Sequence, residues 1–179
     1  MGIADKIIPH YTYDDWVHWE GAWELLEGHP IAMSPKPVPS HQRASAELIT
    51  ELTLALRKSG CKKGKVYDPL DYKITNDTIL VPDIMIICGE VKKKFLDFPP
   101  SLVVEILSPA TALRDRHTKY EIYQQQGVKY YLIVDADKKK IEIYLLKGGE
   151  YVLQNIDSSY QFYLNDDCII APDFNSVFD

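Results

Sequence analysis

Two short apolar runs stand out near the middle of the chain. Residues 82–88 and 102–107 are rich in aliphatic and β-branched side chains and are bounded by prolines and charged loops, which is typical of buried strands. Asp83 stands at the start of the first run and Glu105 inside the second. Burying an unpaired charge is expensive, so an acid in such a strand indicates a specific partner. We expect the two strands to be neighbours whose carboxylates bind one divalent cation.

Helical patterns flank these runs. Residues 12–16 begin with a threonine that suits an N-cap, followed by two acids. Residues 40–59 repeat apolar side chains at three- and four-residue spacing from a capping Ser40, and Gly60 suits a left-handed C-terminal cap. A third amphipathic helix should run from Thr111 to Gly127. Its expected inner side carries Leu113, Tyr120 and Tyr123.

The other short apolar or alternating segments predict strands. They are residues 23–33 (a hairpin turning near Gly28), 65–67, 71–75, 79–81, 130–134, 141–145, 151–153 and one last strand in the tail before Phe174. Prolines 35, 37 and 39 predict an extended linker before the long helix. The resulting order favours an α/β (mixed α+β) fold, a central mixed β-sheet flanked by helices. We expect a single domain over residues 1–179, with its core at about 20–155.

Composition limits the class of protein. At 179 residues and 46% hydrophobic content, the chain suits one globular domain. No run approaches the roughly 18–20 apolar residues of a membrane span, and the N-terminus lacks an apolar signal core. We therefore expect a cytoplasmic protein that does not bind membranes. Its three widely spaced cysteines are expected to be reduced thiols rather than a disulfide framework or a zinc site.

The charge pattern allows nucleic-acid binding only locally. The net charge of −6 lacks the basic footprint of a general nucleic-acid binder. Four basic clusters stand in this acidic background, and each taken alone is more simply a solvated turn. They are residues 62–65, 92–94, 114–119 and 138–140.

Two carboxylates and a backbone carbonyl form a suitable site for Mg²⁺ or Mn²⁺, with positions left for water and substrate. Asp83, Glu105 and the carbonyl of Ile106 would supply these oxygens. Such a site, with a lysine nearby to orient water and counter phosphate charge, suits phosphodiester hydrolysis. A turn residue at Asp83 and a sheet-edge charge at Glu105 are the simpler alternatives for each acid alone.

The ordered set of residues resembles a known family. Pro82-Asp83, a loop, then Glu105-Ile106-Leu107 is similar to the PD-(D/E)XK nuclease superfamily, with its α-β-β-β-α-β core. The longer runs 102–109 and 114–135 resemble, more particularly, the Uma-two-like restriction endonuclease family, many of whose members were described as a domain of unknown function. The resemblance covers roughly residues 10–155 and includes 23–28, 33–35 and His41.

The resemblance implies a displaced lysine. Leu107 stands where the superfamily pattern places lysine, and Lys119 on the following helix matches the position to which this family has moved it. A lysine has a long flexible stem, so its ammonium group can reach one point from either element. Asp115 is four residues before Lys119 and would share its helical face, either as a support or as a surface ion pair.

An acid from an earlier element often completes the metal site in nucleases of this fold. Glu47 and Glu51 lie on the expected long helix, whereas Glu24 on the hairpin matches the family better. His41 at the start of that helix is a second supporting candidate, although such a histidine is more often a capping or packing residue.

The resemblance implies a Mg²⁺-dependent endonuclease acting on DNA, as a homodimer because two strands need two sites. A catalytically silent nuclease fold that binds nucleic acid or a protein is the alternative, favoured by Leu107 and by the negative charge. A hydrolase of smaller phosphoesters is a third possibility. Fold alone does not decide among them.

Overall fold

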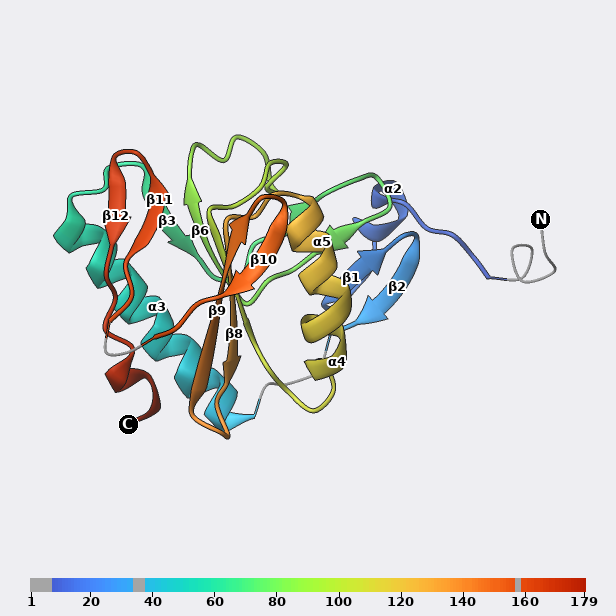
Figure 1. Ribbon diagram of the computed structural model, residues 1–179. Helices are drawn as coiled ribbons and strands as arrows, with labels where there is room; N and C mark the ends of the chain where they lie inside the picture. The colour runs from blue at the N-terminus through green and yellow to red at the C-terminus, as the bar shows by residue number, and fades with distance from the viewer. Residues whose placement is uncertain (1–7, 34–37, 157–158) are drawn as a thin grey trace.

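A six-stranded mixed sheet forms the centre of the computed structural model, which describes residues 8–33, 38–156 and 159–179 (Figure 1). The strand order is β10-β9-β8-β7-β6-β3, and only β7 and β8 pair in parallel. The strands are β3 (Gly64–Tyr67), β6 (Ile84–Cys88), β7 (Leu102–Ile106), β8 (Tyr130–Asp135), β9 (Lys140–Lys147) and β10 (Glu150–Leu153). The predicted mixed α/β class with a central mixed sheet is confirmed.

Helices cover both faces of this sheet (Figure 1). One face packs on α3 (Pro39–Ser59), and the other on a continuous helical segment made of α4 (Ala112–Arg114), a π-helical turn (Asp115–Lys119) and α5 (Tyr120–Gln125). In β6, Ile84 and Ile86 face the α3 side, whereas Met85 and Ile87 face the α5 side. Because both faces are buried, the strand is continuously apolar, and each such side chain contributes about 1.5–3 kcal/mol on burial.

A smaller sheet of order β2-β1-β5-β4 lies beside the α4–α5 segment (Figure 1). Its strands are β1 (Trp23–Leu26), β2 (His29–Ala32), β4 (Tyr72–Lys73) and β5 (Ile79–Leu80), and the short helix α2 (Tyr13–Trp16) precedes it. Glu27 and Gly28, with φ of 47° and 79°, form the predicted tight turn between β1 and β2. The positive φ of Gly28 favours glycine, and a Cβ atom there would also displace the exposed ring of His10.

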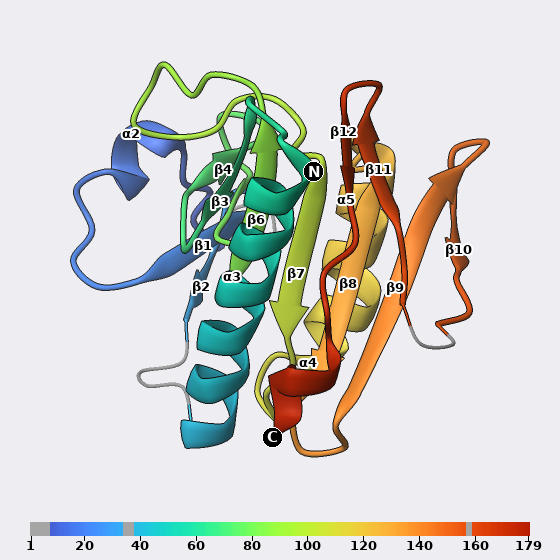
Figure 2. The same ribbon diagram turned by 90° about the vertical axis from the view of Figure 1, so that its left-hand side faces the viewer.

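The C-terminal region folds back onto the α3 side of the central sheet (Figure 2). It forms a hairpin of β11 (Phe162–Asn165) and β12 (Cys168–Ile170), then a 3₁₀ turn (Asn175–Phe178). Phe162, Leu164 and Ile170 are buried in the same hydrophobic cluster as α3. The tail therefore holds two strands where the sequence pattern predicted one.

Several local predictions need correction. α3 begins at Pro39 with Val38 as its N-cap, because proline suits the first helical turn, so Ser40 is not the cap. Leu113 is 79% exposed and does not lie on the inner side of its helix. Cys61 and Cys168 form a disulfide rather than two reduced thiols. The linker prolines 35 and 37, together with Ser34 of the family pattern, lie outside the described residues.

Among the described residues, no helix has the length and apolar character required to cross a membrane.

Candidate active site

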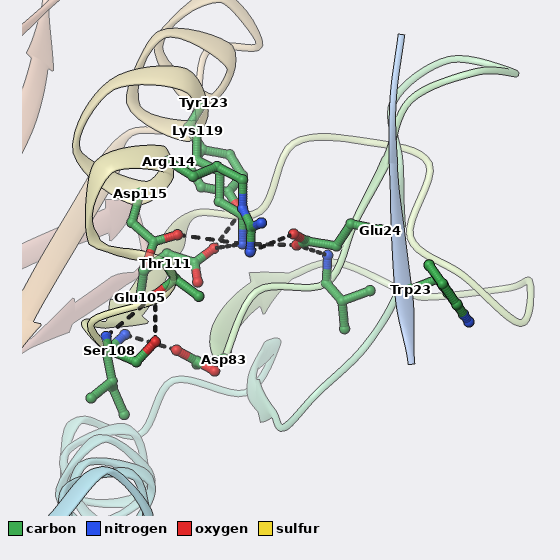
Figure 3. A network of polar contacts seen from close by, with 12 residues as sticks. Trp23, Glu24, Asp83, Glu105, Ser108, Thr111, Arg114, Asp115, Lys119 and Tyr123 are labelled. Carbon is green, nitrogen blue, oxygen red and sulfur yellow. Dashed lines mark hydrogen bonds and ion pairs between the residues drawn. The ribbon is translucent and has the colours of Figure 1, made fainter. Parts of the chain in front are cut away.

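The pairing of β6 with β7 brings Asp83 and Glu105 together (Figure 3). Ile84 pairs with Val104 in antiparallel register, so Asp83, just before β6, lies beside the last residues of β7. The hydrogen-bonded pairing of β6 with β7 ends there. The backbone N–H of Ile106 donates to the side chain of Asp83, at Oδ2, over 2.8 Å. The strands are neighbours, as the sequence predicted.

Lys119 lies at the centre of the carboxylates (Figure 3). Its Nζ is 2.8 Å from Oε1 of both Glu24 and Glu105, and 3.8 Å from Asp115 Oδ1. The side chain is 3% exposed. Burial lowers the pKa of Lys119, but the charges of the three carboxylates raise it by more than burial lowers it. The pKa of Lys119 is therefore above its usual value. The ammonium group is therefore held in its charged form.

A π-helical turn carries both Asp115 and Lys119. Its backbone is wider than an α-helical turn, and both side chains are buried on the face that residues four apart share. The hydroxyl of Tyr131 donates to the backbone carbonyl of Asp115 at 2.7 Å, which satisfies a polar group at the start of this irregular turn. π-turns frequently occur at functional sites, and this one forms one wall of the cavity.

Glu24 is fully buried and reaches the site from β1. Its Oε1 accepts from the backbone N–H of Val81 at 2.9 Å, besides the contact with Lys119. Arg114 Nη2 lies 3.4 Å from its other oxygen. Of the acids considered from the sequence, Glu24 joins the cluster, whereas Glu47 and Glu51 do not line the cavity.

Glu105 is held from the helical side. The hydroxyl of Tyr123 on α5 donates to Glu105 Oε1 at 2.7 Å. Burial raises the pKa of Glu105 well above its usual value, and the negative charges of Asp115, Asp83 and Glu24 raise it further against the opposing effect of Lys119. Burial likewise raises the pKa of Asp115. For both carboxyl groups the effect of burial thus exceeds the opposing effect of the Lys119 charge.

His41, in the first turns of α3, lies beside Asp83. The distance from its Nε2 to Asp83 Oδ2 is 3.4 Å. The hydrogen bond with Asp83 raises the pKa of His41, and burial lowers it. A hydrogen bond with the backbone of Ile106 raises this pKa further, so it lies above its usual value. The imidazole thus contacts the groups expected to hold a metal rather than capping the helix.

The site has the composition that a hard divalent cation requires. Four carboxylates surround two permanent cations, Lys119 and Arg114, which leaves a formal excess of two negative charges. Glu24 Oε2 and Asp115 Oδ1 are buried and make no hydrogen bond among the described residues, although Arg114 Nη2 and Lys119 Nζ lie 3.4 and 3.8 Å from them. Buried carboxylate oxygens without hydrogen bonds are costly, and Mg²⁺ and Mn²⁺ favour oxygen ligands. The residues present therefore fit such an ion.

A cavity of about 160 Å³ contains Asp83, Glu105, Asp115 and Lys119 in its wall. A second cavity of about 370 Å³ adjoins it along α3 and shares Met33, His41, Val81 and Asp83 with it. Asp68 lines this second cavity, and its pKa is raised by burial and then by the charge of Asp83. This second cavity, called the groove below, gives a substrate a route to Asp83.

Sequence reasoning did not place Arg114, Tyr123 or Asp68 in the site. Tyr123 is four residues after Lys119, so the helical spacing that grouped Asp115 with Lys119 also signals Tyr123. Arg114 directly precedes Asp115. Asp68 stands in a loop after β3, and no local pattern indicates its position.

The basic clusters are divided between the two ends of the central sheet (Figure 2). Arg114 and Lys119 line the cavity. Residues 138–140 form the turn between β8 and β9. This turn lies next to the start of α3, where the hydroxyl of Ser40 donates a 3.2 Å hydrogen bond to Asp137. Residues 62–65 and 92–94 follow the C-terminal ends of α3 and β6. They lie at the end of β6 that is remote from Asp83.

The chain is similar to two known proteins. A Synechocystis protein named "Uncharacterized protein slr1290" is 27% identical over 160 residues, which cover 84% of this chain and 83% of that protein. A crystal structure from Anabaena variabilis, described as "a putative nuclease belonging to DUF820", superposes with a TM-score of 0.71 at 17% identity, covering 93% of this chain and 97% of the other. At that identity the superposition shows a shared fold.

The family comparison covers most of the chain. The sequence profile of the Uma2 family, described as "Putative restriction endonuclease", matches residues 11–169. The match includes every residue of the carboxylate cluster and the groove beside it. The chain therefore belongs to the Uma2 family.

Proposed function

We propose that this protein is a Mg²⁺- or Mn²⁺-dependent endonuclease that hydrolyses phosphodiester bonds in DNA. The observation that carries the proposal is the convergence of Asp83, Glu105 and a buried lysine from a different element at one cavity. Membership of the Uma2 family supports the reaction class, and the excess negative charge of the site supports the cofactor.

Asp83 and Glu105 would hold the metal, with the carbonyl of Ile106. When bound, the ion would supply a water of lowered pKa and neutralise charge on the phosphate. Asp83 is already oriented by the Ile106 N–H, and Glu105 by the Tyr123 hydroxyl. The ligands are thus positioned before an ion arrives, which limits the reorganisation that catalysis requires.

Lys119 would orient the attacking water or stabilise the phosphate. Its Nζ now donates to Glu105, and Glu24 lies equally close. It must exchange one carboxylate for a substrate oxygen, and its three-donor ammonium group permits this. Asp115 and Glu24 would keep the amine charged and in place. His41 would support Asp83 at the mouth of the groove.

DNA would approach over the end of the sheet that carries the groove. Arg114 and the turn at residues 138–140 would be the basic groups nearest to the DNA at that end, whereas residues 62–65 and 92–94 are too remote to contribute. We propose a homodimer as the active form, since cleavage of both strands favours two sites related by a two-fold axis. Light scattering of the purified protein, alone and with a DNA duplex, tests this assembly.

Cleavage of supercoiled plasmid with Mg²⁺ or Mn²⁺ tests the activity. Wild type should nick the plasmid, a chelator should abolish nicking, and Asp83→Asn, Glu105→Gln and Lys119→Met should each be inactive. Lys94→Met is the matched control, because Lys94 is exposed and lies outside the groove. A folded wild type that cuts neither duplex nor single-stranded DNA with either metal would replace this proposal with the silent binding protein.

A further inference from the structure

A second cluster of reactive side chains lies outside the groove. All three cysteines of the chain meet there, with their sulfur atoms within 4.8 Å of one another. Cys61 stands two residues after the end of α3, Cys88 ends β6 and Cys168 begins β12. These positions are separated by 27 and 80 residues, so only the tertiary fold brings them together.

The backbone leaves room for three sulfur atoms. Gly64 on β3 is the partner of Cys88 across the β3–β6 ladder. A Cβ atom at position 64 would lie 2.8 Å from Cys61 Sγ and 3.4 Å from Cys168 Sγ. A side chain there would push into the sulfur atoms, so this glycine keeps the space between the strand and the cluster free.

A disulfide accounts for only two of these residues. Cys61 and Cys168 are bonded to each other, and Cys88 retains its thiol. A structural cross-link between α3 and the C-terminal hairpin would need neither Cys88 nor its approach to the other two sulfur atoms. The third thiol is the feature that requires a different explanation.

Two of the three cysteines line surface cavities. Cys61 lines a surface cavity of about 320 Å³ together with Cys168, and a second of about 340 Å³ together with Gly64. Lys62, Lys63 and Asp167 line the first cavity. The thiolate is the form of cysteine that binds metals. Neither cavity contains a residue of the carboxylate cluster.

We propose that the reduced cluster is a binding site for one thiophilic d¹⁰ cation, Cu⁺ or Zn²⁺, held by the thiolates of Cys61, Cys88 and Cys168. Thiolates select these ions over hard cations. Thiolates at about 2.3 Å from a zinc ion are roughly 3.8 Å apart, within the present spacing once the disulfide is opened.

The redox step balances with a dithiol as reductant. A cellular dithiol gives two electrons and two protons to the Cys61–Cys168 bond, which breaks to two thiols while the dithiol becomes a disulfide. Binding of the cation then releases the three thiol protons to solvent. The disulfide form and the metal-bound form are therefore alternative states of one site.

Metal titration of the whole protein tests the proposal without any use of nuclease activity. The protein is reduced with a phosphine, desalted under anaerobic conditions and titrated with Zn²⁺ and, separately, Cu⁺ in competition with a chromogenic chelator. Cd²⁺ serves as a spectroscopic probe, because each bound thiolate adds to an ultraviolet charge-transfer band. We expect one equivalent to bind, with a Cd²⁺ band of three thiolates, and no binding before reduction.

Cys88→Ser is the decisive variant, since it leaves the disulfide intact during folding. It should weaken binding by at least about 100-fold and lower the Cd²⁺ band by about a third. Lys94→Met, at an exposed position outside both clusters, is the control and should bind these ions as wild type does. Preference for Cu⁺ or for Zn²⁺ would identify the cation. Absence of stoichiometric binding, or equal binding by Cys88→Ser, would overturn the proposal.

Discussion

The two ends of strand β6 differ in chemistry. Asp83 stands just before its first residue, within a cluster of carboxylate oxygens, and Cys88 is its last residue, within a cluster of sulfur atoms. Five residue steps separate them, about 17 Å along an extended strand. One strand thus connects a group of hard ligands to a group of soft ligands.

The two clusters are built in different ways. The carboxylate cluster around Lys119 is partly recognisable in the sequence, because Asp83, Glu105 and Lys119 lie at or in neighbouring elements along the chain. The sulfur cluster has no motif, since its members come from the ends of distant elements. Hard oxygen sites and soft sulfur sites select different cations, so each end should respond to its own metals.

Activity should separate the two ends most sharply. Asp83→Asn removes one negative charge and should lower the rate of plasmid nicking by at least about 100-fold. Cys88→Ser should leave the rate within about twofold, because it lies at the remote end of the strand. Initial rates at fixed Mn²⁺ measure both. Equal losses in the two folded variants would break the comparison.

Stability should also reveal the carboxylate cluster. Lys119→Met leaves Glu24, Glu105 and Asp115 buried without their common cation, and should lower the free energy of unfolding by about 3–5 kcal/mol. Urea unfolding measures this change. Exposed Lys94→Met should shift it by less than about 0.5 kcal/mol. Adding Glu105→Gln to Lys119→Met should cost less than the sum of the single changes, and strict additivity would argue against direct coupling.

The sulfur end should respond to reductant. Reduction of the Cys61–Cys168 bond releases a long loop and should lower the free energy of unfolding by about 2–4 kcal/mol. Cys61→Ser should show the same loss without reductant and no further loss with it. Thermal unfolding with and without a phosphine gives the measurement. A wild type insensitive to the phosphine would show that this bond does not stabilise the fold.

The smallest effect should come from Glu142, which lies outside both clusters. Burial alone would raise the pKa of Glu142, but hydrogen bonds from Arg116, Lys140 and Tyr144 lower it to about 2. Its stabilisation is therefore present above the ordinary pKa of about 4.3 and is lost as the pH falls toward 2. Glu142→Gln should cost no more than about 1 kcal/mol at neutral pH.

That difference should vanish under acidic conditions. Urea unfolding at several pH values below 5 follows the gap between wild type and the variant. A gap that persists at pH values near 2 would mean that packing, and not charge, accounts for the contribution of Glu142.

The sequence predicted the parts of the fold that follow a regular period. β6 and β7 were recognisable because buried strands are continuously apolar, and α3 because its stripe repeats every three to four residues. Leu113 was misplaced because the π-helical turn that follows it widens the helix and rotates the face shared with Tyr123. A period of 3.6 residues cannot represent such an insertion.

The site was predictable to the extent that its residues share local elements. Asp83 and Glu105 follow from the strand patterns and Asp115 from its helical spacing to Lys119, whereas Lys119 and Glu24 were indicated by the family resemblance. Asp68 and the meeting of the cysteines depend on loop and terminal packing, which leaves no periodic signal. The roles of Asp83, Glu105 and Lys119 as ligands and catalytic groups are predictions that the variants above test.

The bond between Cys61 and Cys168 also makes a covalent ring of most of the chain. Asp83, Glu105 and Lys119 lie inside this ring, and Glu24 and His41 lie on the arm before it. A protease that cuts once between residues 61 and 168 would open the ring without dividing the molecule. The nicked protein would migrate as one piece on a non-reducing gel and as two on a reducing one.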